Sequence, residues 1–209
     1  MINDPLLQPF QLKHLNLKNR IITTSHEPAY NENGLPKDRY IAYHLERAKG
    51  GIAMTMTAGS AVVSKDSPPS FDNIHAYKDE VVPCIKKLTE AIHDYDCKIM
   101  IQLTHLGRRT SWSKGDWLPS ISSGKHREPA HKAFPKVVES WDIERIIKEY
   151  GDAAERMKEG GMDGVEIEGQ GHLTGQFLSP LTNELETKYG GELENRLRFI
   201  LEVLSEIRK

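Results

Sequence analysis

The arrangement that most limits the fold of this chain is a repeated alternation of short apolar runs with longer stretches of helical period. Strands are expected at four runs rich in β-branched and apolar residues: 20–24, 52–57, 98–103 and 164–167. Helices are expected after them, where apolar residues recur three and four apart: 36–49, 81–94, 143–159 and 194–209. Because strands and helices alternate, the pattern predicts βα units around a parallel sheet, which is an α/β fold.

The number of these units is half of what a closed barrel needs. A (β/α)8 barrel, the TIM barrel, has eight strands and typically about 250 residues. This chain has 209 residues and four such units, so we expect it to form about half of such a barrel. Since a four-stranded sheet has two unpaired edges, either further residues complete it or two copies pair as a homo-oligomer.

A long loop, at about residues 104–140, separates the third expected strand from its helix. A loop of this length in a compact domain is usually functional or disordered. Its prolines and its tryptophans, Trp112 and Trp117, favour an ordered lid over a flexible linker.

Charge and composition exclude several classes of function. The 28 basic and 30 acidic side chains are scattered, so no basic stripe could follow a nucleic-acid backbone. No apolar run approaches the roughly 20 residues that span a bilayer, and the N-terminus does not resemble a signal peptide. We therefore expect a cytoplasmic protein without a membrane partner. The two cysteines, Cys84 and Cys97, lack CxxC spacing and are expected to be reduced structural thiols.

Candidate site residues follow the expected strands, because a barrel of this kind carries its active groups at the carboxyl ends of strands. The residues at these positions are Ser25, His26, Glu27, Ala58, Gly59, Gln102, His105, Arg108, Glu168 and His172. The set has no Ser-His-Asp order, no HExxH and no cysteine and histidine cluster with metal-ligand spacing. Hydrolysis by a triad or by zinc is therefore not expected, and no metal site is predicted.

Four sequence segments carry a family resemblance. They are LKNRI at 17–21, QLTHLGR at 102–108, QFLSP at 176–180 and YGGELENRLRF at 189–199. In this order they resemble the signature segments of the old yellow enzyme, or NADH:flavin oxidoreductase, family, and they extend over nearly all of the chain. The segments 24–28 and 168–172 resemble more closely a subgroup that demethylates N-methylated amino acids such as N-methylproline or dimethylglycine.

The resemblance implies a flavoprotein that binds FMN, with residues 1–209 as the first four βα units, the N-terminal half, of its TIM barrel. A flavin ring needs apolar walls and a few fixed donors and acceptors at its pyrimidine edge. Gln102 matches the glutamine that serves this edge in the family. Gly59 matches a small residue that lets the backbone approach the ring, and Ser25 and His26 match positions whose backbone lies along the flavin.

Departures from the family pattern narrow the expected chemistry. Where the family usually has two polar residues that hold a substrate oxygen, Glu168 takes the first place and His172 follows four residues later. The tyrosine that ene-reductases use as a proton donor is replaced, with Leu173 beside His172. A carboxylate repels an enolate-like oxygen but attracts an ammonium group, which favours amine oxidation over alkene reduction. Glu27 stands where related dehydrogenases have a flavin-bonding cysteine, so covalent attachment is not expected.

The resemblance therefore predicts oxidative N-demethylation, in which a hydride passes from an N-methyl carbon to FMN. Glu27 and Glu168 would hold the substrate cation, and His172 would orient it or take its proton. The residues expected at the walls of the substrate site, or in the loop beside it, are Tyr30, His105, Trp112 and Trp117. The alternative within the same family is an ene-reductase that uses NAD(P)H as electron donor.

A third interpretation is a catalytically incomplete fragment. In the family, an arginine at strand five lies at the pyrimidine edge of the flavin, and the loops after strands seven and eight hold its phosphate. These parts lie beyond the four units expected here. On this interpretation the chain alone is inactive. A 4Fe-4S cluster and a second nucleotide are expected only if a further C-terminal region carries them.

Overall fold

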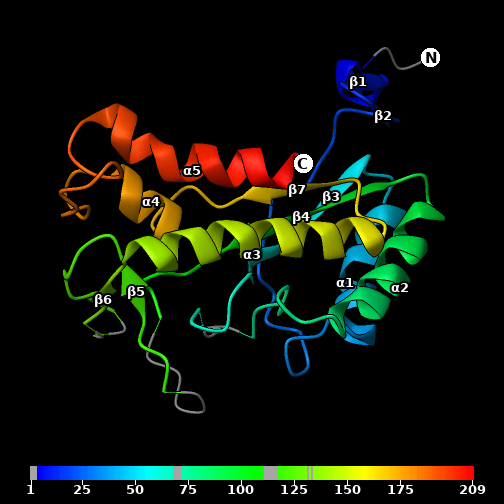
Figure 1. Cartoon of the computed structure of the whole chain (residues 1–209). Coiled ribbons are helices and arrows are strands. Elements are labelled where there is room, and N and C mark those ends of the chain that lie inside the picture. The colour runs from blue at the N-terminus through cyan, green and yellow to red at the C-terminus, as the bar shows by residue number, and fades with distance from the viewer. Residues whose placement is uncertain (1–3, 68–71, 111–116, 131, 133) are drawn as a thin grey trace.

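The computed structural model describes residues 4–67, 72–110, 117–130, 132 and 134–209, and its centre is a parallel sheet of three strands. The strands are β3 (Met54–Val62), β4 (Lys98–Thr104) and β7 (Gly164–Ile167), in the spatial order β3-β4-β7. The long helices between and after them are α1 (Asp38–Lys49), α2 (Val81–His93), α3 (Ser140–Glu159) and α5 (Leu193–Ile207). This succession along the chain, coloured from blue to red in Figure 1, confirms the predicted βα order.

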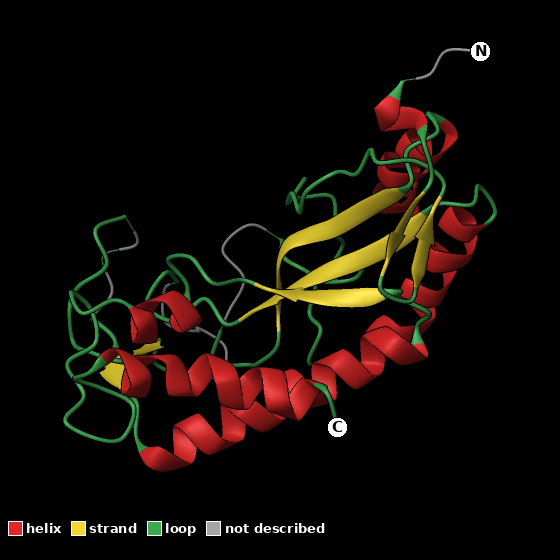
Figure 2. Ribbon diagram, turned by 90° about the horizontal axis from the view of Figure 1, so that it is seen from above, coloured by secondary structure: helices red, strands yellow, loops and turns green. Residues whose placement is uncertain are grey.

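The helices were predictable because their apolar stripes are buried. In α2, Val81, Ile85, Leu88 and Ile92 are fully buried, as their spacing predicts. Figure 2 shows α3 and α5 side by side along one face of the sheet. Within the described part of the chain, none of the helices is long and apolar enough to cross a bilayer.

The first strand expected from the sequence, 20–24, is not a regular strand. It is joined to β3 by one parallel bridge between Ile22 and Met54. Two backbone hydrogen bonds of 3.0 Å also join them: the Thr23 amide donates to the Met54 carbonyl, and the Ala53 amide donates to the Ile21 carbonyl. A segment that pairs with a neighbouring strand on one side only has few inter-strand hydrogen bonds to hold it in a regular strand conformation. The segment therefore occupies the position of a first barrel strand without the regular geometry of one.

The two faces of the sheet differ because side chains alternate along a strand. On the outer face Ile99, Ile101 and Leu103 are fully buried in the core that the helices cover. On the inner face Met54, Met56 and Met100 form a separate apolar cluster. The inner face would line the interior of a barrel. The inner-face residues that follow the methionine cluster, toward the carboxyl ends of the strands, are therefore the candidates for binding and catalysis.

A small N-terminal hairpin, which the sequence pattern did not predict, covers the amino end of the inner face. It follows a short 3-10 helix, Pro5–Leu7, and consists of β1 (Phe10–Leu12) and β2 (Leu15–Leu17). Leu15 and Leu17 pack against the methionine cluster of β3 and β4. Figure 1 places the hairpin at the end of the molecule away from α4 and β5.

The long loop expected at about 104–140 is partly ordered by structure of its own. It contains the short parallel strands β5 (Ile121–Ser122) and β6 (Lys136–Val137), and Ser120 and Ser123 are fully buried. The loop packs on α4 (Leu173–Leu178), a short helix that the sequence pattern also missed. Its role as an ordered lid stays a prediction.

Candidate functional site

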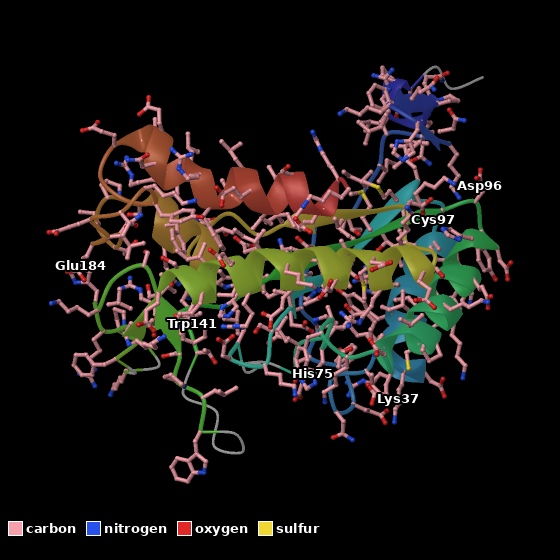
Figure 3. All side chains as sticks on the ribbon, in the orientation of Figure 1. Lys37, His75, Asp96, Cys97, Trp141 and Glu184 are labelled. Carbon is pink, nitrogen blue, oxygen red and sulfur yellow. The ribbon has the colours of Figure 1, made fainter. Side chains whose placement is uncertain are left out.

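The candidate site lies at the carboxyl ends of β4 and β7, at the end of the molecule where α4, β5 and β6 gather (Figure 1). Figure 3 shows Glu184 at this end and Cys97, which precedes β4, at the opposite end. Cys97 is buried and Cys84 is half-buried, and both are free thiols. The thiols therefore stand apart from the residues described below.

Gln102 of β4 lies at the centre of a polar cluster on the inner face. Its amide nitrogen donates to the Ser25 hydroxyl at 2.9 Å and to the Glu166 carboxylate at 2.5 Å, and the Ser25 hydroxyl donates to the same carboxylate at 3.2 Å. Gln102 is only 6% exposed. Because both amide hydrogens have protein partners, Oε1 is the atom left to accept a hydrogen bond from a ligand.

Glu166 is a site residue that sequence reasoning missed, because it stood inside an expected strand. The register pairs it directly with Gln102, so the two side chains leave neighbouring strands on the same face. Alternation along the fourth strand, counted from its pairing with the third, is the signal that could have found it.

Gly59 marks a close approach between β3 and the first segment. A Cβ atom at this position would lie 2.9 Å from the Glu27 backbone nitrogen and 3.3 Å from the His26 carbonyl carbon. Its neighbours Ala58 and Ser60 have positive φ angles of 47° and 97°, and the pairing of β3 with β4 shifts here. Strained backbone at a strand end is a frequent mark of a functional site. A side chain at position 59 would push the 26–27 segment away from β3.

Glu27 is a half-buried residue with a buried, unpartnered carboxylate oxygen. Its Oε1 accepts from the Ala29 amide at 2.9 Å, whereas its Oε2 is buried and has no hydrogen-bond partner among the described residues. Burial raises the pKa of Glu27 to about 7, the charge of Asp72 adds to this, and the Ala29 hydrogen bond opposes it. At neutral pH the group therefore stands near its midpoint, where an arriving cation would favour the ionised form.

His26 and Tyr30 lie together at the exposed side of the same segment. The Tyr43 hydroxyl is 3.0 Å from Nδ1 of His26, and the ring of Tyr30 meets the ring of Tyr43 edge-on. The Arg39 guanidinium lies 3.8 Å from the centre of the Tyr30 ring. Both predicted residues thus belong to an aromatic and cationic group on α1 and the loop before it.

Glu168 and His172 occupy one turn between β7 and α4. Glu168 accepts through Oε1 from the Gln170 amide at 2.6 Å, and its carbonyl accepts from the Thr174 hydroxyl. His172 is the residue before α4, and its Nδ1 lies 2.9 Å from the Thr104 hydroxyl. Burial first, and then the charges of Arg109 and His105, lower the pKa of His172 to about 4, so the ring is neutral at pH 7.

His105, predicted to touch substrate or to order the loop, is fully buried. The Gly107 amide donates to its Nδ1 at 3.0 Å, so the ring proton is on Nε2, which donates to Asp66 at 2.8 Å. Burial alone would raise the pKa of Asp66, but His105, Ser64 and Arg145 hold it below its usual range. In this structure the ring of His105 orders the loop and has no exposed surface for a ligand.

Of the two predicted tryptophans, the structure describes only Trp117. Trp117 is 83% exposed, and Trp112 lies outside the described residues. Arg108 donates from its guanidinium to the His126 carbonyl at 3.1 Å and from its backbone to Gln176. The part of the long loop that the structure describes is therefore held by Arg108 and Gln176.

The site residues fit the pyrimidine edge of a flavin better than a metal ion. Gln102 offers one acceptor oxygen without a protein partner, and Glu27 has an oxygen without one. Gly59 has no side chain, so the backbone can approach closely at this position. Among the described residues, no group of three or more histidine, cysteine, aspartate or glutamate side chains is arranged to hold a metal. The roles of single residues toward FMN stay predictions.

Parallel βα units with polar side chains at the carboxyl ends of strands define this chain as a portion of a β/α-barrel enzyme. The NADH:flavin oxidoreductase / NADH oxidase family matches residues 5–209, and the chain belongs to that family of FMN-dependent oxidoreductases. The resemblance predicted from its segments is confirmed.

Two relatives and one solved structure place the chain more closely. It is 67% identical over 208 residues to a Rhizobium meliloti (strain 1021) protein named "Probable N-methylproline demethylase", covering 100% of this chain and 31% of that protein. It is 47% identical to the "Multifunctional alkene reductase/demethylase OYE" of Caballeronia cordobensis, covering 99% of this chain and 31% of that protein. The chain thus spans about a third of the length of these curated relatives.

Among solved structures, morphinone reductase in complex with tetrahydroNAD superposes with a TM-score of 0.91 at 26% identity. The match covers 98% of this chain and 60% of that chain. The prediction of a partial TIM barrel is therefore confirmed, while the assignment of residues 1–209 to a single N-terminal half stays a prediction.

Proposed function

We propose that this chain supplies the flavin edge and the substrate end of an oxidoreductase that removes the methyl group from an N-methylated amino acid. The observation that carries the proposal is the 67% identity, along the whole chain, to a protein named as an N-methylproline demethylase. The charge of the site supports it, because carboxylates rather than a pair of oxygen-binding donors stand at the strand ends.

FMN, when bound, would supply the two-electron acceptor for a hydride from the N-methyl carbon. Glu27 would first take the proton of the bound ammonium group, so that loss of the hydride leaves an iminium, which water would hydrolyse to formaldehyde and the demethylated amine. Gln102 would hold the flavin edge through Oε1, fixed by Ser25 and Glu166. Glu27, with a pKa of about 7, would ionise as the ammonium group of the substrate arrives. Glu168 would add a second negative charge from the turn before α4.

A second candidate function is alkene reduction. The relative from Caballeronia cordobensis is named for both activities, and it is 47% identical to this chain. NAD(P)H would be the electron donor in that case. Cytoplasmic location, pairing of copies, and a 4Fe-4S cluster with a second nucleotide in a further region stay predictions.

The first experiment asks whether the chain alone holds flavin. The purified chain is incubated with FMN and desalted, and its visible absorption spectrum is recorded. Retained flavin bands would mean that the chain assembles a binding site by itself. A colourless protein would favour the interpretation of the chain as an incomplete part of the enzyme.

The second experiment tests the reaction in a complete barrel. A chimera is made in which this chain replaces the matching 31% of the Rhizobium meliloti protein. N-Methylproline should bleach its flavin without oxygen and yield formaldehyde in turnover. Faster turnover of an activated enone than of every N-methyl amine tested would reject demethylation as the main activity.

A further inference from the structure

The side chain of Arg109 lies against the turn that joins β7 to α4. A Cβ atom at Gly171 of this turn would lie 3.0 Å from Nη1 of Arg109 and 3.7 Å from its Cδ. The guanidinium and part of its alkyl stem therefore lie close to the bare backbone of Gly171, whose φ of 75° is one that side chains rarely adopt. Because the same turn contains Glu168 and His172, the cation lies beside two candidate substrate residues.

The buried amide of Gln176 holds the segment before Arg109 and this turn together. Its Nε2 donates to the carbonyl oxygens of Leu106 and Gly171, at 3.2 Å and 3.0 Å. Its Oε1 accepts from the Arg108 amide at 3.1 Å. Since one side chain binds the backbone on both sides, the base of Arg109 is fixed relative to the turn.

The charges at the turn are of both signs at neutral pH. A guanidinium stays protonated in proteins, so Arg109 supplies a positive charge. His172 does not, because burial first, and then the charges of Arg109 and His105, lower its pKa to about 4. Glu168, whose carboxylate accepts from the Gln170 amide at 2.6 Å, supplies the negative charge. The turn thus has the two charges that a zwitterion needs.

We propose that Arg109 binds the carboxylate group of an N-methylated amino acid and makes the site specific for amino acids over simple amines. The inference rests on the proposed function, in which Glu27 and Glu168 bind the ammonium group. In an α-amino acid both charged groups are bonded to the same carbon atom, so their binding sites must lie close together. A guanidinium suits a carboxylate because it can donate two parallel hydrogen bonds to it.

The proposal requires a preference between ligands that differ only in the carboxylate. N-Methylpyrrolidine has the ring and the methyl group of N-methylproline but no carboxylate, and pyrrolidine is related to proline in the same way. A site built to bind a polar group discriminates strongly against an analogue that lacks it. The unsubstituted chimera should therefore bind proline more tightly than pyrrolidine and have a lower KM for N-methylproline than for N-methylpyrrolidine.

The test applies both ligand pairs to Arg109→Gln in the chimera, with binding measured by calorimetry and turnover by formaldehyde release. The dissociation constant of proline and the KM for N-methylproline should each rise about tenfold or more, because a charge-assisted hydrogen bond is lost. The values for pyrrolidine and N-methylpyrrolidine should not change, which would also show that the variant is folded.

Two further variants sharpen the result. Arg109→Lys keeps the charge but not the planar pair of donors, so it should recover part of the affinity for proline. Lys87→Gln is the control, since Lys87 is exposed on α2, which Figure 1 places at the opposite end of the molecule from α4. It should change no value for any of the four ligands.

An equal loss in Arg109→Gln for ligands with and without the carboxylate would overturn the inference. So would an unsubstituted chimera that shows no preference for proline over pyrrolidine. Proline binding needs no demethylation, so an Arg109-dependent affinity for proline without formaldehyde release would count against the proposed function alone. Formaldehyde release with the same KM for N-methylproline in Arg109→Gln and the unsubstituted chimera would count against this inference alone.

Discussion

The amide nitrogen of Gln102 lies 2.5 Å from a carboxylate oxygen of Glu166, and the two residues are direct partners in the register of β4 and β7. The contact uses one amide hydrogen, and Ser25 takes the other. A carboxylate cannot donate, so it accepts only from the nitrogen and turns Oε1 of Gln102 toward any ligand. Glu166 thus determines which end of the amide is available.

The first prediction follows from this contact. Glu166→Ala in the chimera should raise the FMN dissociation constant about tenfold or more, because a hydrogen bond to a charged group is worth about 1.5–3 kcal/mol. Glu166→Gln keeps an acceptor oxygen and should recover part of the affinity. Titration of FMN fluorescence measures both, and an unchanged dissociation constant in Glu166→Ala would contradict the role assigned to Glu166.

The same pair illustrates how far the sequence predicts the site. Gln102 was predictable from its segment, because a carboxamide at a strand end in QLTHLGR matches a family pattern. Glu166 was not, because a lone glutamate in a four-residue apolar strand has no motif, and only the pairing register places it beside Gln102. Thr104 was missed for a similar reason, since its contact with His172 depends on tertiary packing.

The fold shows the same division between local and tertiary causes. The long helices and two of the three strands follow from periodicity. The strand expected at 52–57 is β3, which begins at Met54 and extends to Val62. The hairpin β1–β2 and the helix α4 are too short for a periodic signal, and packing stabilises them. The 20–24 segment has the composition of a strand, but with a neighbour on one side only it keeps a single bridge.

Gly59→Ala should destabilise the fold. The new Cβ would lie 2.9 Å from the Glu27 nitrogen, a backbone atom that cannot rotate away. We expect a loss of about 1–3 kcal/mol in the free energy of unfolding, measured by urea denaturation. Gly169→Ala is the matched control, since nothing lies within 4 Å of its Cβ position. Equal stability of the two variants would show that the 26–27 segment yields without cost.

Glu27 should make stability fall as the pH rises. The folded state holds the Glu27 proton up to about pH 7, whereas the ordinary value is 4.5, so between these values the folded state binds more protons. Stability from this group is therefore lost from about pH 5 to about pH 7. Glu27→Gln lacks this loss and should gain about 2 kcal/mol relative to wild type between about pH 5 and about pH 8.

The control for this prediction is Glu186→Gln at an exposed position. Its difference from wild type should be independent of pH within the error of urea denaturation. A Glu27→Gln difference that is equally flat would mean that the buried oxygen is solvated in solution.

Asp66 should be essential for the order of the loop around His105. Asp66→Asn removes one carboxylate partner of Arg145, which keeps Glu149 at 2.9 Å, and weakens the bond to the fully buried His105. A fully buried charge pair costs about 3–5 kcal/mol to break, but the Arg145 side chain is 32% exposed, so we expect a smaller loss of about 2 kcal/mol in urea denaturation at neutral pH. Because the pKa of Asp66 is below its usual range, the advantage of wild type persists above about pH 4 and is lost only in stronger acid.

Glu168 should decide between the two candidate reactions. Its carboxylate would attract the ammonium group of an N-methyl amino acid and repel the negative charge that develops on an enone during reduction. In the chimera, Glu168→Gln should therefore raise KM for N-methylproline about tenfold, the effect of removing one partly desolvated charge pair. The same variant should reduce an activated enone faster than the unsubstituted chimera. Glu186→Gln, an exposed glutamate, should change neither rate. If Glu168→Gln lowers both rates alike, the prediction is wrong. Glu168 would then act by holding the turn before α4 through the Gln170 amide, and another residue would bind the charged group of the substrate.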